Sequence, residues 1–371
     1  MRDSAHREIG SELDLELASA FSRRLQPLAR MFPGASSQPL LTESGRAALR
    51  AALWAWINRN GNGGRFLIPA YLCVAVLQPF RELGIEVDFY RIGRRLEIDW
   101  DEIARKLDTG KYSGFLLIRY FGSSIQNAPP KGFLERWPEV TAIEDAAQAF
   151  LTPGVGGAGA YTVYSLRKWI GMPDGGAVIG RTPGGLSLLP GGSRFAYERL
   201  AAFELRQAYR AGNLRSKQPY LDRFHEAESI LDGDAGGVAA MSGLSERILR
   251  TSDLRAIAAA RRENFRFLMT RFPKFKNVAP LGMAWGERDV PLGFPIVCRG
   301  RDRIRLGLKQ KRIYCPIHWK MPPMLEGLPE AREALALSRS ILTLPCDQRY
   351  TTVDMEYMLS CLRDVARGLR N

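Results

Sequence analysis

The chain has 371 residues, of which 46% are hydrophobic and 25% charged, so it is a folded globular protein and neither disordered nor collagen-like. Its 53 lysines and arginines exceed its 39 aspartates and glutamates, which gives a net charge of +14. Such an excess predicts an anionic partner, either a nucleic acid or a small phosphorylated ligand.

No signal peptide or spanning helix is expected, because prolines interrupt the most apolar run, Phe66 to Phe80. The five cysteines lie far apart without a C-x-x-C pair, which favours reduced thiols over disulfides or a zinc site. Three scattered histidines also argue against a metal centre. We expect a cytoplasmic protein that binds neither a membrane nor a metal.

In chain order, an amphipathic helix is predicted over Ser11 to Met31, followed by a linker up to Pro39. Helical and strand patterns alternate from there. The helices are predicted at 48–60, 72–83, 100–107 and 133–137, and the strands at 65–69, 85–92, 114–121, 140–145, 159–166 and 175–180. This alternation is typical of α/β folds, in which helices cover a mostly parallel sheet.

A long helical section with little strand character is predicted from Ser193 to Phe272. The last hundred residues mix helices and strands again, with strands in 291–300 and 340–347. We therefore divide the chain into an N-terminal helix and arm (1–39), a large α/β domain (40–250) and a smaller C-terminal α/β domain (251–371).

The densest basic stretch, Arg299 to Arg312, carries seven positive residues and one aspartate, which makes nucleic-acid binding an alternative to consider. Ile304, Leu306 and Leu308 interrupt the stretch, which favours a helix with one solvated face. No nucleic-acid recognition motif accompanies it, so we expect no nucleic-acid partner.

The stretch GVGGAG (154–159) matches the G-x-G-x-x-G pattern of dinucleotide-binding sites. That pattern requires a strand before it and a helix after it, whereas Pro153 precedes it and the strand-like AYTVYSL follows. A glycine-rich turn into a strand is the better interpretation.

Three short patterns could carry chemistry. Asp145 ends an apolar strand and Gln148 follows it, at the place where ligands bind in open α/β sheets; a cap on a following helix is an equal alternative for Asp145. Lys168 follows another strand beside Trp169; a lysine partly removed from water favours the neutral amine that a Schiff base needs, although most basic residues must be surface charges. Ser44 and Gly45 begin a helix, a place that favours phosphate or is simply an ordinary cap.

Together these residues form the set that a pyridoxal 5′-phosphate enzyme requires. From about Leu40 onward the sequence resembles the DegT/StrS family of aminotransferases, which have the fold type I architecture. The resemblance is carried by ESGRAAL, IPAYLCVAVLQPFRELGIEVDFYRI, RYFG, IEDAAQAF, YSLRKWIGMPDGGAVI, MSGLSERIL, ARRENF, IYCPIHW and SILTLPCDQRY.

The resemblance implies a role for each matching residue. Lys168 would form the Schiff base with pyridoxal 5′-phosphate, Asp145 would face the pyridine nitrogen, and Gln148 would face the ring hydroxyl. Ser44, Gly45 and Ser165 would hold the phosphate. The family completes its site with a second subunit, so a homodimer with a shared site is implied.

The sequence also departs from the family pattern. Only three positions separate Ser165 from Lys168, fewer than is usual in the family. Arg46 replaces a small residue, Cys73 occupies the position that usually stacks on the ring, with Tyr71 nearby, and Ser242 replaces the asparagine that contacts the phosphate from the neighbouring subunit. We keep all four as candidate cofactor-binding residues.

The resemblance implies an enzyme, an aminotransferase that moves an amino group from an amino acid, typically glutamate, to a keto acceptor such as a nucleotide-linked keto sugar in polysaccharide biosynthesis. Arg46 and Arg119 could hold an anionic small-molecule substrate, and His318 and Trp319 could border the acceptor site, although His318 could also be a packed loop residue. Another pyridoxal phosphate reaction on an amino acid, or a non-catalytic scaffold with regulatory function, remains open. Lys168 argues against the sugar dehydratases of the family, which carry histidine there.

Overall fold

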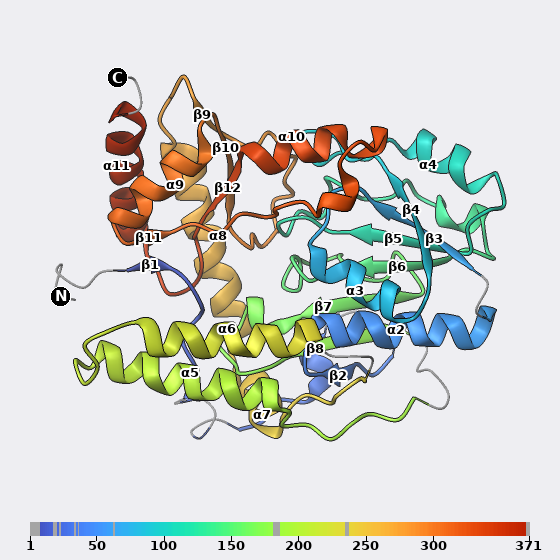
Figure 1. Cartoon of the computed structure of the whole chain (residues 1–371), viewed down its shortest axis with the longest axis horizontal. Helices are drawn as coiled ribbons and strands as arrows, with labels where there is room; N and C mark the ends of the chain where they lie inside the picture. Colours follow the sequence, from blue (N-terminus) through green and yellow to red (C-terminus); the bar gives the residue numbers. More distant parts are fainter. Residues whose placement is uncertain are drawn as a thin grey trace.

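The computed structural model describes residues 8–17, 21, 24–32, 35, 37–61, 64–180, 186–233 and 237–368. A seven-stranded sheet in the order β2-β8-β7-β6-β5-β3-β4 forms its centre (Figure 1). The strands are β2 (Leu40–Thr42), β3 (Arg65–Pro69), β4 (Glu86–Tyr90), β5 (Gly114–Ile118), β6 (Thr141–Asp145), β7 (Tyr161–Ser165) and β8 (Gly176–Gly180). Neighbouring strands from β4 to β7 are parallel, and β8 is antiparallel to both β7 and β2, which confirms a mostly parallel sheet.

The helix α2 (Gly45–Asn60) begins where the sequence predicts. The Ser44 side chain caps it by accepting a hydrogen bond from the Ala47 N–H, and Gly61 ends it with a φ of 75°. The helices α3 (Val74–Glu82) and α4 (Trp100–Leu107) match two further predicted segments. The helix expected at 133–137 is only a short 3₁₀ helix, Leu134–Arg136.

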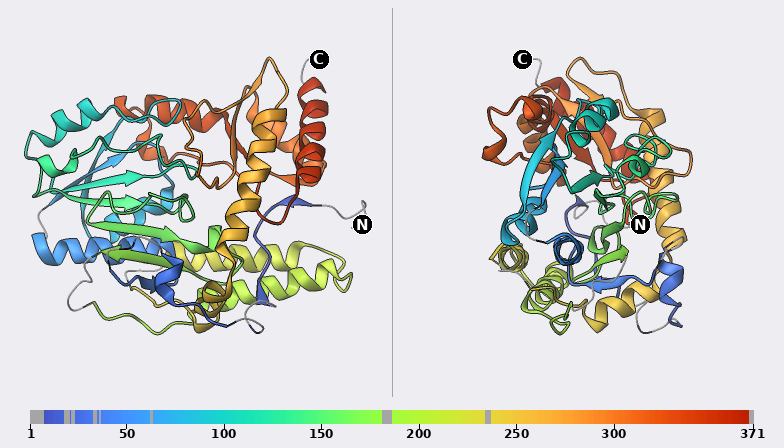
Figure 2. Two further views of the ribbon diagram at one scale, coloured as in Figure 1. Left: turned by 180° about the vertical axis from the view of Figure 1, so that it is seen from behind. Right: turned by 90° about the vertical axis from the view of Figure 1, so that its right-hand side faces the viewer.

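The predicted helical section consists of α5 (Arg194–Arg210), α6 (Gln218–Gly233), α7 (Gly243–Thr251) and α8 (Leu254–Arg271). The long helices α5 and α6 form an antiparallel hairpin along one side of the molecule, at the bottom of Figure 1. Seen from behind, α8 rises from α7 toward the C-terminal part of the chain, and so links the two halves of the molecule (Figure 2).

The C-terminal part contains a second, antiparallel sheet in the order β12-β10-β9. The elements of the C-terminal part are β9 (Val278–Pro280), β10 (Phe294–Cys298), α9 (Arg301–Gln310), β11 (Ile313–Tyr314), α10 (Arg332–Ser340), β12 (Ile341–Leu344) and α11 (Thr352–Gly368). Side chains of β10, β12 and α11 form a separate hydrophobic core there. Among the described residues, no helix has the length and apolar character that a membrane span requires. The domain boundaries at residues 39 and 250 stay predictions.

The N-terminal region differs from the predicted single helix over Ser11 to Met31. Residues 9 and 10 form β1, which pairs with β11; residues 13–16 and 24–27 are not helical; and Leu28–Met31 is a 3₁₀ helix. Residues 18–20 and 22–23 of the predicted helix lie outside the described ones. The backbone of this segment serves other partners, since Arg349 and Arg206 donate to the carbonyl oxygens of residues 11–13.

Gly171, which follows the turn of Lys168, packs directly on the N-terminal segment. The Glu16 N–H donates to the Gly171 carbonyl at 3.0 Å, and a Cβ atom at Gly171 would lie 1.6 Å from the Asp14 carbonyl oxygen. The backbone atoms of Asp14 and Leu15 leave no space for a side chain at Gly171, so residues 14–16 pack closely against the end of the lysine turn.

We expect Gly171→Ala to destabilise the protein by about 1–3 kcal/mol, because the added methyl group must push the N-terminal segment away. Urea unfolding and limited proteolysis of the N-terminal segment measure both effects. Gly243→Ala is the control, since nothing lies within 4 Å of its built Cβ. Equal stability of the two variants would contradict the packing.

Candidate active site

Asp145 is the last residue of β6 and lies at the carboxyl end of the parallel strands. Its side chain is 8% exposed, and Oδ1 accepts a hydrogen bond from the Ala147 N–H at 2.9 Å. Burial raises the pKa of Asp145, and the charge of Lys168 offsets part of that rise. Residues 147–150 form turns, so Asp145 does not cap a helix as the alternative interpretation held.

Gln148 is fully buried beside Asp145, with 1% exposure. Its Oε1 accepts a hydrogen bond from the Phe121 N–H at 2.8 Å, which fixes the amide orientation. Its Nε2 is buried and has no hydrogen-bond partner in the described structure. An unpaired buried N–H group is costly, so this donor fits a ligand acceptor that the described residues do not supply.

Lys168 ends the 3₁₀ helix η4 (Leu166–Lys168), which follows β7 directly. Ser165, at the end of β7, lies against the start of α2, because a Cβ atom at Gly45 would lie 2.9 Å from the Ser165 Cβ. The first N–H groups of α2 have no intrahelical acceptor, and the helix dipole favours an anion there. Ser44, Gly45 and Ser165 therefore lie together at a helix N-terminus, a place that suits an anion, and Lys168 follows three positions after Ser165. We call these three residues the phosphate cradle; their binding of a phosphate stays a prediction.

Lys168 also opens onto a cavity of about 750 Å³, which the N-terminal segment, the lysine turn and α6 line together with the C-terminal part. Seven cationic and four acidic side chains line the cavity: Arg167, Lys168, Lys217, Arg261, Arg305, Lys309 and Arg349, with Glu8, Glu12, Glu228 and Asp347. The lining does not include Asp145, Gln148 or the phosphate cradle. Lys168 therefore belongs to both groups of candidate residues, the one beside Asp145 and the one around the cavity. The cationic side chains outnumber the acidic ones in this lining, which favours anionic occupants.

His318 lines the same cavity as Lys168, whereas Trp319, which we expected beside it, is not among the lining residues. A border with the acceptor stays a prediction. Its Nδ1 lies 2.8 Å from the Thr343 Oγ1. Burial, together with the charge of Lys168, lowers the pKa of His318 to about 3, so the imidazole is neutral at physiological pH. His318 is thus available as a neutral hydrogen-bonding group beside the lysine.

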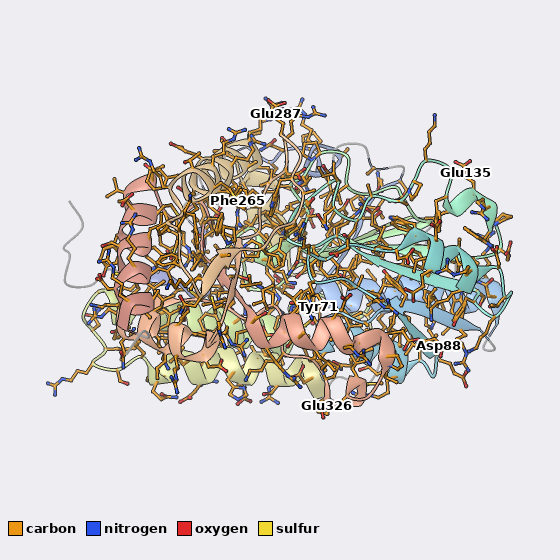
Figure 3. All side chains as sticks on the ribbon, turned by 90° about the horizontal axis from the view of Figure 1, so that it is seen from above. Tyr71, Asp88, Glu135, Phe265, Glu287 and Glu326 are labelled. Carbon is orange, nitrogen blue, oxygen red and sulfur yellow. The ribbon has the colours of Figure 1, made fainter. Side chains whose placement is uncertain are left out.

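Tyr71 and Cys73 occupy different environments. Tyr71 is fully buried near the centre of the molecule (Figure 3). It donates a hydrogen bond to the His318 carbonyl oxygen, and its ring centre lies 5.5 Å from that of Trp319. Tyr71 therefore supports the loop of His318. Cys73 precedes α3 as a half-buried free thiol. Stacking of either residue on a ring stays a prediction.

Arg46 and Ser242 have partners elsewhere in the protein. The Arg46 guanidinium donates to Gln78 Oε1 at 2.6 Å and pairs with Asp232 at 2.9 Å, which directs it toward α3 and α6. The Ser242 hydroxyl donates to the buried Asp174 at 2.5 Å and caps α7. A role for either side chain at a phosphate would require these bonds to be given up.

Arg119, which we expected to hold an anionic group, is paired inside the protein. Its Nε donates to Glu144 Oε1 at 2.6 Å, and the two side chains are 4% and 1% exposed. Glu144 therefore neutralises Arg119, so the cations that face the cavity are different ones. The helix α9 confirms the solvated-helix interpretation of the basic stretch, since Ile304 and Leu308 are buried, but Arg305 and Lys309 line the cavity.

Sequence reasoning missed two contributions to the cavity wall. The N-terminal segment lines the cavity with Glu12, whose carboxylate pairs with Arg199 at 2.9 Å; the arginines around it lower the pKa of Glu12 to about 2. Arg261 of α8 lines it beside Lys168. Both come from regions far from the lysine in sequence. Arg261 lies within the ARRENF stretch that carries the family resemblance, although no role was assigned to it there, and no spacing pattern marks Glu12.

Two further expectations from the sequence concern a dinucleotide site and a metal site. The glycines of 154–159 lie in a loop that leads into β7, as the glycine-turn interpretation predicts. The described residues contain no group of three or more histidine, cysteine, aspartate or glutamate side chains that could hold a metal ion.

No family model and no curated protein matches the sequence. Solved structures do match the fold. PseC of Helicobacter pylori, an aminotransferase involved in the biosynthesis of pseudaminic acid, superposes with a TM-score of 0.68 at 14% identity over 98% of this chain and 100% of its own. A DegT DnrJ EryC1 StrS aminotransferase from Brucella abortus gives 0.61 at 17% identity over 98% and 92%.

The GDP-4-keto-6-deoxy-D-mannose-3-dehydratase of E. coli, solved with bound hydrated PLP, gives a TM-score of 0.64 at 16% identity over 95% of this chain and 98% of its own. At such low identities the similarity shows the fold alone. It confirms the expected fold type I architecture over nearly the whole chain, and the chemistry must be argued from the side chains.

Asp145→Asn is expected to raise the melting temperature of the cofactor-free protein at pH 7 by about 1–3 °C. The raised pKa of Asp145 means that its ionised form costs stability, a cost that grows as pH rises through the folded pKa. Asparagine keeps the Ala147 contact without the charge. Thermal unfolding between pH 4 and pH 8 tests this, and a lower melting temperature at pH 7 would contradict it.

His318→Asn is expected to make the loss of stability between pH 6.5 and 4.5 shallower. The lowered pKa of His318 means that the unfolded chain binds a proton first, so stability is present above pH 6.5 and falls as pH decreases toward 3. Urea unfolding at several pH values measures the slope. The exposed His225 provides the control His225→Asn, and the same slope in both variants would refute the assignment.

Proposed function

We propose that this protein is a pyridoxal phosphate-dependent aminotransferase that moves an amino group from glutamate to a nucleotide-linked keto sugar. The observation that carries the proposal is the group at one edge of the sheet: Lys168, the buried Asp145 within range of its charge, and the phosphate cradle at the start of α2. The fold neighbours support it, since they include aminotransferases and a dehydratase with bound PLP.

The residues at this edge fit the cofactor. The unpaired Nε2 of Gln148 is a donor for the ring hydroxyl, and the carboxylate of Asp145 is an acceptor for a protonated ring nitrogen. Ser44, Gly45 and Ser165 would bind the phosphate. When bound, pyridoxal 5′-phosphate supplies an electron sink that allows an amino group to pass between two carbons.

Each residue then has a defined task. The Lys168 amine would hold the cofactor and, as a free amine, would be the base that takes a proton from the substrate carbon and returns it. The buried Asp145 would keep the ring nitrogen protonated, because an opposite charge favours the charged form of both groups. The neutral His318 can form a hydrogen bond with the keto substrate without taking the proton of the ring nitrogen.

The acceptor is expected to be anionic. Arg305 and Lys309 lie one helical turn apart on α9 and both line the cavity of Lys168. Three other cavity cations already have acidic partners: Lys217 pairs with Glu8, Arg167 with Glu228, and Arg349 with Asp347. The phosphates of a nucleotide-linked sugar would match the two α9 cations. We further propose a homodimer with a shared site, as the resemblance implies, and a cytoplasmic location stays a prediction.

Lys168→Ala is expected to abolish the visible absorbance band that the protein gains with pyridoxal phosphate, because the change removes the amine that would bond the cofactor. Lys131→Ala, at an exposed position, should keep the band. Absorbance spectra of the purified proteins measure both. A band that survives in Lys168→Ala, or none in the unmodified protein, would overturn the catalytic proposal and favour a scaffold.

Glutamate should convert the pyridoxal form to the pyridoxamine form and yield 2-oxoglutarate. The spectral change and the keto acid are measured together. If another amino acid is consumed without its keto acid appearing, the reaction is a different pyridoxal phosphate reaction, as the shortened lysine turn would allow.

The double variant Arg305→Gln, Lys309→Gln is expected to weaken UDP binding by about three- to tenfold at low salt, the range for two partly solvated charges. Isothermal titration calorimetry measures the affinity. The control is Arg303→Gln, Lys311→Gln, which removes the same charge from exposed positions outside the cavity lining. Equal weakening in both variants would show a general charge effect and refute the α9 assignment.

A further inference from the structure

The turn that presents Lys168 is short and has few bonds of its own. The Trp169 and Ile170 N–H groups both donate to the Leu166 carbonyl, at 2.9 and 3.1 Å. The carbonyl groups at the end of a helix have no donors within it, so those of Lys168 and Trp169 need partners from outside the turn. Both partners come from the C-terminal part of the chain.

Arg261 of α8 is the first partner and is 1% exposed. Its Nη2 donates to the Lys168 carbonyl at 3.4 Å, its Nη1 donates to the Leu292 carbonyl at 3.0 Å, and its guanidinium lies 4.8 Å from the centre of the Trp169 ring. The planar guanidinium thus fixes the backbone of the lysine and the ring of the next residue together.

Gln348, in the loop after β12, is the second partner. Its Nε2 donates to the Trp169 carbonyl at 2.8 Å, and its Oε1 accepts from Arg261 Nε at 2.9 Å. The two side chains are therefore bonded to each other and to consecutive carbonyls of the lysine turn. We call this pair the Arg261–Gln348 clamp.

Trp169 connects the clamp to the other side of the site. Its indole Nε1 donates to the Ala147 carbonyl at 3.1 Å, two residues after Asp145. The Trp169 side chain thus sets the position of the lysine backbone relative to Asp145, and the clamp holds this side chain in place. Because the short turn has few internal hydrogen bonds, these contacts determine its conformation.

We propose that Arg261 and Gln348 are positioning residues, which hold the backbone of Lys168 so that its amine reaches the cofactor site. The role of the clamp rests on the proposed function, whereas the clamp's hydrogen bonds are present in the protein without a cofactor. Because both residues come from the C-terminal part, a movement of that part relative to the large sheet would displace the lysine turn.

The test compares Gln348→Leu, Arg261→Gln and Arg261→Lys with the control Arg255→Gln, which removes a charge from an exposed position on the same helix. Hydrogen–deuterium exchange of the cofactor-free proteins reports the Trp169 and Ile170 amides. We expect about tenfold faster exchange there in Gln348→Leu and Arg261→Gln, a smaller rise in Arg261→Lys, and no change in the control.

A second readout uses the proteins loaded with pyridoxal phosphate. The pH midpoint of the visible band should shift in the clamp variants and stay unchanged in the control, since the amine is held differently. Unchanged exchange at the lysine turn, or equally faster exchange throughout the protein, overturns the clamp. If Arg261→Gln does not fold, Gln348→Leu decides. Absence of the band in the unmodified protein overturns the proposed function instead.

Discussion

The burial of Asp145 at the end of β6 is the constraint on which the site depends. A carboxylate with 8% exposure and one backbone donor is poorly compensated, and its raised pKa expresses that cost. The charge of Lys168 and the hydrogen bond from the Ala147 N–H both reduce this cost. A positively charged ring nitrogen beside Asp145 would reduce it further, so under the proposed function the bound cofactor would stabilise the protein.

The short lysine turn explains why distant parts of the chain gather around it. Gly171 packs on the N-terminal segment, Trp169 bonds to the loop after Asp145, and Arg261 holds the Lys168 carbonyl. A longer loop could satisfy its own backbone groups, whereas this turn leaves them for other elements. The carbonyl groups of residues 11–13 likewise bond to arginine side chains from other parts of the chain.

The sequence predicts those parts of the fold that depend on local patterns. The cap at Ser44, the strands that end at Asp145 and Ser165, and the alternation that makes the sheet parallel all follow from neighbours a few residues apart. The bonds of Arg46 to Asp232 and of Ser242 to Asp174 join residues far apart in the chain. No periodicity encodes such pairs, so the candidate roles of these side chains could not be judged from the sequence.

The net charge of +14 shows how composition and placement differ. Many cations are held by acidic partners, as Arg119 is by Glu144 and Arg50 by Glu82. In the basic stretch, the helical period turns Ile304 and Leu308 inward and leaves Arg305 and Lys309 along the cavity. A surface helix can therefore be solvated and still direct two charges toward a site. The positive field at Lys168 thus depends on which face of α9 packs against the second sheet, and much less on the total charge of the chain.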